Sequence, residues 1–196
     1  RFNYGVRFEL YLMGHADQLE AIHELMHGEA LNYHELALDY AQAGCWTEAI
    51  QVLQSCEAVS CHPLTHYYIG WAHTRLGDSA AAKAAFVQAE QCDTYCCFPN
   101  RLEDVLALRS ALNVHPAGAK AGYYLGCLYY DKRQYDVAME CWERSAELDP
   151  DFPTVWRNLA LGYFNKRGEE QRALEYMERA FALDPADARI LMELDQ

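Results

Sequence analysis

The sequence has 196 residues, 52% of them hydrophobic, and its 29 acidic and 16 basic side chains give a formal net charge of −13. That share of apolar residues is enough to form a buried core, while the excess of acidic groups argues against binding the phosphates of a nucleic acid. No apolar run approaches the roughly 18 residues needed to span a membrane, and eight cysteines in a chain of this length fit reduced cytoplasmic thiols better than a disulfide scaffold.

The first segment, residues 1–29, predicts a degenerate pair of helices. It contains "HELMH", a match to the H-E-x-x-H pattern. On a helix, His23 and His27 would lie one turn apart and could hold zinc, with Glu24 as a general base. The continuation that such hydrolases usually show is missing, because Ala30 stands where a glycine would be needed. We therefore favour a pair of ordinary helical histidines and expect no enzymatic activity.

From residue 30 onward, four similar units follow one another with a period of about 34 residues. They align on Ala49, Ala82, Ala138 and Ala173. Each unit has a small residue in its first half, namely Ala37, Gly70, Gly126 and Ala160. Each has a large apolar residue in its second half, namely Leu53, Phe86, Trp142 and Met177. Small residues opposite large ones predict two helices whose axes cross closely.

We expect one solenoid over residues 1–196, built from antiparallel helix pairs. The predicted pairs are 30–63, 64–96, 119–152 and 153–187. A lone helix at 99–116 accounts for the longer interval between the second and third units, and 188–196 begins a further first helix. Because the chain starts at Arg1 without a methionine, we expect a fragment of a longer protein.

The third and fourth units, "YYLGCLYYDKRQYDVAMECWERSAELDP" and "VWRNLALGYFNKRGEEQRALEYMERAFALDP", resemble tetratricopeptide repeats. The resemblance implies an all-α, right-handed superhelical solenoid whose first helices line a concave groove for protein segments. Local departures are Arg133, where glycine is usual, and one inserted residue near Gly168. In addition, "CFPNRLEDV" followed by these units is similar to the helical repeat region of large bacterial multidomain proteins of unassigned function.

In the register of that family, the groove positions carry aromatic rings and polar or cationic side chains. The candidate partner-binding residues are Tyr67, Trp71, Arg75, Lys120, Tyr123, Tyr130, Arg157, Phe164 and Asn165. Rigid rings with nearby donors are typical of protein-binding surfaces. Arg75, Lys120 and Arg157, with Arg189 in the unit begun at 188, indicate a partner with carboxylate groups. The alternative is that these cations pair with acids of the chain itself.

The stretch "CDTYCCFPNR" raises the question of a metal or redox site. Cys92 falls at the repeat position that Leu148 fills in the third unit, so we expect it to be buried. Cys96 and Cys97 are adjacent, and there is no second well-spaced pair as in a zinc ribbon. We interpret the stretch as a joint between helices, with no disulfide, metal or cofactor, and expect Cys96 or Cys97 to react faster than Cys92.

A second group, Cys61, His62 and His66, surrounds the start of the second repeat. Packing against the preceding unit is the interpretation that we favour over metal binding at this group.

Taken together, these patterns predict a non-catalytic protein-interaction or scaffold module. Its groove is expected to bind a peptide of a separate protein or to dock an upstream domain of its own chain. One alternative is a structural spacer or self-association solenoid. The other is a zinc hydrolase at His23, Glu24 and His27.

Overall fold

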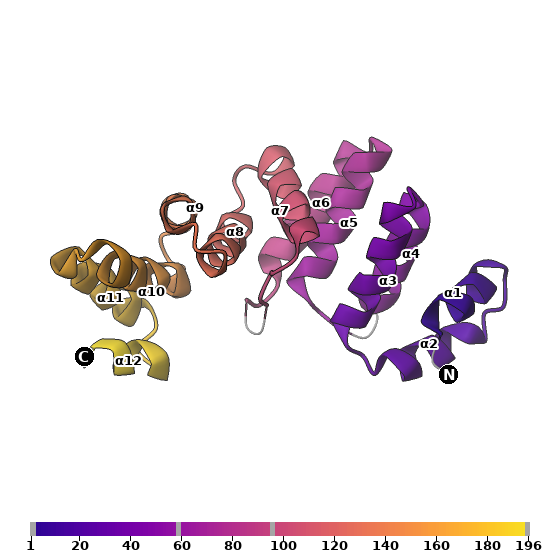
Figure 1. The fold of residues 1–196 in the computed structure, drawn as a ribbon, viewed down its shortest axis with the longest axis horizontal. Coiled ribbons are helices and arrows are strands. Elements are labelled where there is room, and N and C mark those ends of the chain that lie inside the picture. Colours follow the sequence, from indigo (N-terminus) through magenta and orange to yellow (C-terminus); the bar gives the residue numbers. More distant parts are fainter. Residues whose placement is uncertain (1–2, 58–59, 95–96, 195–196) are drawn as a thin grey trace. The chain divides into compact units, whose positions relative to one another are not determined.

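The computed structural model of the chain describes residues 3–57, 60–94 and 97–194. Within these ranges the chain forms helices and turns and no strand, which confirms the predicted all-α fold (Figure 1). The chain divides into two compact units. The first comprises residues 1–97 and 102–115, and the second residues 98–101 and 116–196.

The helices of each unit follow one another with short connections. The first unit contains α1 (Tyr4–Leu12), α2 (Gln18–Met26), α3 (Ala30–Gln42), α4 (Trp46–Glu57), α5 (Pro63–Leu76), α6 (Ser79–Gln91) and α7 (Leu102–Val114). The second contains α8 (Lys120–Asp131), α9 (Tyr135–Leu148), α10 (Pro153–Gly162), the π-helical turn η1 (Tyr163–Arg167), α11 (Glu170–Leu183) and α12 (Ala188–Leu194).

Neighbouring helices pack in pairs at the positions of the predicted repeats. The pairs are α3 with α4, α5 with α6, α8 with α9, and α10 with α11. Helix α7 lies within the segment predicted as a lone helix, and it packs against α5 and α6 of its own unit. The idea that α7 is an insertion between two repeats stays a prediction.

Two helix crossings depend on a glycine beneath an aromatic ring. A Cβ atom on Gly70 would lie 2.3 Å from Phe86, and a Cβ atom on Gly126 would lie 2.3 Å from Trp142. Trp142 is also held by a hydrogen bond of 3.1 Å from its indole nitrogen to the carbonyl of Tyr123. The predicted pairing of a small residue with a large one is therefore present in both repeats.

The turns inside the helix pairs use the left-handed backbone conformation. Gly44, Gly77 and Gly168 have φ of 82°, 80° and 66°. Arg133 occupies the equivalent place between α8 and α9 with φ of 60°. A side chain is disfavoured in this conformation. The turn nevertheless keeps the same left-handed backbone conformation with arginine in place of glycine.

The inserted residue near Gly168 is absorbed by η1. Residues Tyr163–Arg167 form a π-helical turn that continues α10, and the backbone nitrogen of Gly168 donates to the carbonyl of Tyr163. A π-turn accommodates one extra residue without ending the helix. The helix pair α10–α11 therefore keeps its packing while the side chains of η1 are displaced around the helix.

The cysteines of the predicted joint are buried where the structure describes them. Cys92 is 5% exposed, in agreement with its predicted repeat position, and Cys97 is 4% exposed. Because Cys97 is as buried as Cys92, its burial gives no reason for a faster reaction, and the expectation that Cys96 or Cys97 reacts faster stays a prediction. Cys96, which carried the same expectation, lies outside the described residues. No helix in the described ranges is long and apolar enough to cross a membrane.

Candidate partner-binding sites

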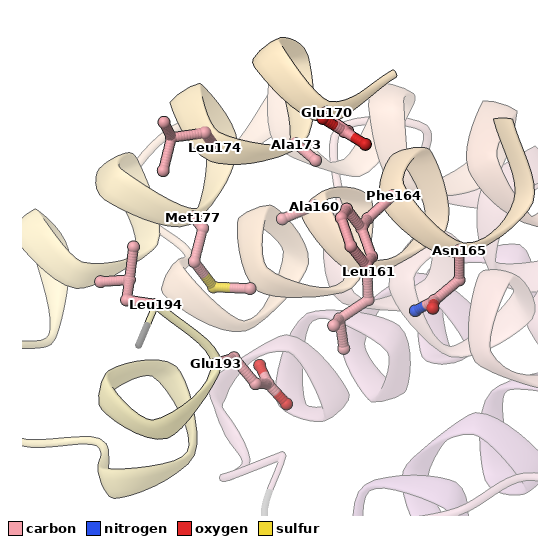
Figure 2. A pocket seen from close by; sticks show the side chains of 10 residues that line it. All are labelled: Ala160, Leu161, Phe164, Asn165, Glu170, Ala173, Leu174, Met177, Glu193 and Leu194. Atoms are coloured by element: carbon pink, nitrogen blue, oxygen red, sulfur yellow. The ribbon is translucent and has the colours of Figure 1, made fainter. Parts of the chain in front are cut away.

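The second unit contains a pocket of about 200 Å³ between α10, η1, α11 and α12. Its lining residues are Ala160, Leu161, Phe164, Asn165, Glu170, Ala173, Leu174, Met177, Glu193 and Leu194. Figure 2 shows Met177 of α11 directed toward Leu161 and Phe164, with Glu193 of α12 below them. Two of the predicted groove residues, Phe164 and Asn165, thus come together in one hollow.

The apolar side chains of this pocket are unusually open to solvent. Phe164 is 57% exposed and Leu174 is 46% exposed. Phe164 lies in η1, so the π-turn determines the direction of its ring. By contrast Met177, 6% exposed, forms the floor of the pocket and belongs to the helix crossing. The pocket therefore combines a buried floor with exposed apolar walls.

The cations of the second unit are largely committed to acids of the same chain. Arg157 on α10 pairs with Glu193 on α12. The guanidinium of Arg189 contacts both carboxylate oxygens of Asp187, at 2.6 Å in the shortest contact. Hydrogen bonds from Arg189 lower the pKa of Asp187 to about 2, so this partner stays ionised at neutral pH. The alternative of pairing within the chain thus holds for Arg157 and Arg189.

The remaining predicted residues of the second unit are buried or half-buried. Tyr123 is 8% exposed and meets the ring of Phe152 edge-on at 4.9 Å. Tyr130 is half-buried, with ring centroids 5.0 Å from Tyr135 and 5.3 Å from Trp142. Lys120 is half-buried at the start of α8. Of these three side chains, Tyr123 is the least accessible to a partner.

In the first unit, Trp71 and Arg75 form a small aromatic and cationic patch with Trp46. The rings of Trp46 and Trp71 meet edge-on at 5.2 Å, and the guanidinium carbon of Arg75 lies 5.3 Å from the Trp46 centroid. Arg75 is exposed and makes no ion pair with the described residues. Tyr67, predicted for the same surface, is fully buried and donates to Glu90 at 2.9 Å. Its ring packs inside the unit and cannot contact a partner.

The H-E-x-x-H motif does not adopt the geometry of a zinc hydrolase. Helix α2 ends at Met26, and His27 follows it in the left-handed conformation with φ of 53°. The two histidines therefore do not lie one helical turn apart on a helix face. Nδ1 of His23 lies 2.6 Å from the hydroxyl of Tyr33, whose pKa burial raises to about 12. The tyrosine stays protonated at neutral pH, and a hydrogen bond links its hydroxyl to Nδ1 of His23.

Comparison with known proteins gives a match at the third and fourth units. Residues 126–167, from the middle of α8 to the end of η1, match the family model described as TPR repeat. In the structure, these residues run through the crossing of Gly126 with Trp142. This segment is a tetratricopeptide repeat. The predicted family resemblance is thereby confirmed, and a role in protein interaction follows at the level of the family.

Solved structures with similar repeats share little sequence with this chain. YrrB, described as a TPR protein with an unusual peptide-binding site, is 15% identical with a TM-score of 0.47, and the match covers 98% of this chain and 89% of YrrB. MamA is 19% identical with a TM-score of 0.44, and 88% of each chain is covered. A thermophilic TPR protein of Thermus thermophilus is 17% identical with a TM-score of 0.43, over 85% of this chain and 97% of that protein.

Several side chains at these sites escaped the sequence reasoning. Trp46 begins a second helix, whereas the repeat register assigns only first-helix residues to the groove. Glu170, Leu174 and Glu193 lie on α11 and α12, beyond the predicted groove positions. The signal that could have pointed to them is the residue inserted before Gly168, because an insertion in a regular repeat marks a place where the surface changes.

Proposed function

We propose that the chain is a non-catalytic module that binds a peptide segment of a partner protein through the pocket of its second unit. The observation that carries the proposal is Phe164, an aromatic side chain more than half exposed on a π-turn beside a pre-formed apolar hollow. Exposed rings at the wall of a pocket are the kind of anchor on which protein-binding energy concentrates.

The size and polarity of the pocket indicate what it accepts. Its volume of about 200 Å³ lies below the roughly 300–1,000 Å³ of most small-molecule sites. It therefore suits one apolar side chain of a peptide better than a cofactor. Glu170 and Glu193 are the charged residues of its lining. Because Glu193 already pairs with Arg157, a basic residue next to the apolar anchor would complement chiefly Glu170.

Binding of a partner's carboxylate group is better supported in the first unit than in the second, where Arg157 and Arg189 already pair with acids of the chain. Arg75 is exposed, lies over Trp46 and makes no ion pair with the described residues. A guanidinium of this kind can hold a carboxylate with two hydrogen bonds. An acidic residue of a partner, or of another part of the same polypeptide, is therefore expected at the patch of Trp46, Trp71 and Arg75.

The test is a selection of peptides from a displayed library on the full chain, followed by titration of the binders. Phe164→Ala should weaken binding about tenfold or more, as expected for a central anchor. Val137→Ala is the matched control, because Val137 is exposed on α9 and outside the pocket. Equal affinities for wild type and Phe164→Ala would contradict the proposal. Arg75→Ala, tested with acidic binders, examines the first-unit patch separately.

Self-association is the second candidate, favoured by two exposed apolar side chains on α12. Leu191 is 54% exposed and Met192 is 68% exposed. Sedimentation velocity over a range of concentrations distinguishes this candidate from a monomeric module. A concentration-dependent dimer that the double change Leu191→Ser and Met192→Ser abolishes would support it, and a single species at all concentrations would exclude it.

A further inference from the structure

Three potential metal ligands meet in the first unit, where α6 returns to the beginning of α5. Their ligand atoms, in Cys61, His66 and Cys92, all lie within 4.8 Å of one another. Within residues 3–57, 60–94 and 97–194, this is the one such group of three or more histidine, cysteine or acidic side chains. The sequence placed Cys61 beside His66, but Cys92 joins them only in the folded chain.

The helix pair explains why residues so far apart in sequence come together. Cys61 lies just before α5, and His66 is in its first turn. Cys92 is the C-cap of α6. Because α5 and α6 are neighbouring helices joined by a short turn at Gly77, the end of α6 lies beside the start of α5. The cluster thus closes the open end of the helix pair.

The spacing of the two sulfur atoms suits a shared metal ion. The Sγ atoms of Cys61 and Cys92 are 3.6 Å apart. Two thiolates bound tetrahedrally to zinc at about 2.3 Å are separated by roughly 3.8 Å. Only a small adjustment of the side chains would therefore be needed. Thiolate and imidazole together are ligands that select zinc over magnesium or calcium.

His66 is held in a way that fits a ligand. Its Nδ1 atom lies 2.8 Å from Oε1 of Glu57. The approach is not aligned for a hydrogen bond, and Nδ1 is buried without such a bond to any described residue. A carboxylate beside a metal-binding histidine commonly fixes the ring and increases its basicity. Glu57 is therefore placed to orient the ring through Nδ1.

We propose that Cys61, His66 and Cys92 bind a zinc ion that clamps the α5–α6 helix pair at its open end. Two thiolates balance the charge of Zn²⁺, so the site is neutral apart from Glu57. Three protein ligands leave one position of a tetrahedral ion for water. The role is structural, because the ion would join the segment before α5 to the end of α6.

Without an ion, the two cysteine sulfur atoms make weak hydrogen bonds to each other and to a backbone carbonyl. The sulfur of Cys92 donates to the carbonyl of Gln88 at 3.5 Å, and the two thiols contact each other. Thiols are weak hydrogen-bond partners. These two thiol contacts therefore add little stability, and a disulfide between Cys61 and Cys92 is the competing chemistry that the experiment must distinguish.

The experiment measures zinc in the full chain after loading under reducing conditions and removal of free metal. Wild type should retain about one zinc ion per chain, and Cys61→Ser and His66→Gln should each lose it. Cys45→Ser is the control, because Cys45 is an exposed cysteine outside the cluster. Cobalt loading should give a thiolate-to-cobalt charge-transfer band in wild type and in Cys45→Ser only.

Three further readouts decide the remaining outcomes. Circular dichroism establishes that Cys61→Ser, a change at an exposed side chain, is folded. A chelator should lower the melting temperature of wild type and leave that of Cys61→Ser unchanged. The proposal is overturned if wild type retains no zinc, if both variants retain as much as wild type, or if mass spectrometry finds a Cys61–Cys92 disulfide instead of bound metal.

Discussion

Gly70 and Gly126 each lie beneath an aromatic ring of the following helix, at a distance that leaves no room for a methyl group. The ring cannot move aside easily, since Phe86 and Trp142 are themselves buried. Gly122, one turn before Gly126 on α8, is also buried, but a Cβ atom there would meet its nearest neighbour, the carbonyl of Cys141, at 3.4 Å. The two glycines of α8 thus provide an internal comparison.

Gly126→Ala should reduce the free energy of unfolding by about 1–2 kcal/mol. Forcing a methyl group into a packed crossing costs roughly 1–3 kcal/mol, and the better helix propensity of alanine offsets up to about 1 kcal/mol of that. Gly122→Ala should be neutral or stabilising, because only the propensity changes. Urea denaturation of both variants checks this, and equal destabilisation by the two would refute the assigned crossing.

Cys127 on α8 should react slowly with alkylating reagents. Burial raises the pKa of its thiol from 9.0 to about 11, although hydrogen bonds such as that from Asn158 act in the opposite direction. At neutral pH its thiolate fraction is then about a hundred times below that of an ordinary thiol. Mass spectrometry after timed labelling, with exposed Cys45 as the reference, measures the difference. Similar rates at the two sites would contradict this prediction.

The same pKa difference has a consequence for stability. The folded chain holds the thiol proton of Cys127 more tightly than the unfolded chain. The tighter binding of this proton in the folded chain contributes to the free energy of unfolding. That contribution is fully present below a pH of about 9 and is lost as the pH rises toward about 11. Cys127→Ala should remove that component from the alkaline part of the stability profile.

At the scale of elements, the helix pairs follow from the sequence because their physical cause is local. The apolar pattern and the small residues at the crossings predict two helices in each repeat, and Gly44 and Gly77 mark turns that need a left-handed residue. The form of η1 could not be predicted in the same way. The extra residue near Gly168 was evident, but a bulge, a longer turn and a π-turn all accommodate one residue.

Arg133→Gly should stabilise the α8–α9 pair by about 0.5–1 kcal/mol. The left-handed φ of 60° is costly for arginine and available to glycine without strain, and part of the gain is lost to the greater freedom of glycine in the unfolded chain. Arg133→Ala keeps the strain and removes only the charge, so it should change little. Thermal and urea unfolding of the three proteins distinguish these effects, and destabilisation by Arg133→Gly would contradict the assigned strain.

At the scale of the whole molecule, the two candidate sites belong to different units and make separate claims. The peptide pocket lies in the second unit and the cysteine–histidine cluster in the first. The sequence indicated Phe164 and Asn165 because the repeat register assigns them to a first helix. It could not show that Arg157 pairs with Glu193, because that depends on how α12 packs. It also could not bring Cys92 to Cys61, since that contact requires the helix pair to fold first.

The most direct test of the account is hydrogen–deuterium exchange of the full chain with and without a peptide selected on it. Binding in the pocket should slow exchange in η1 (Tyr163–Arg167), in the first turns of α11 and in α12, because a ligand there stabilises the backbone that carries Phe164, Leu174 and Glu193. The pair α8–α9 serves as the reference within the same unit. Protection confined to segments outside α10 to α12 would contradict the proposal that this pocket is the partner-binding surface.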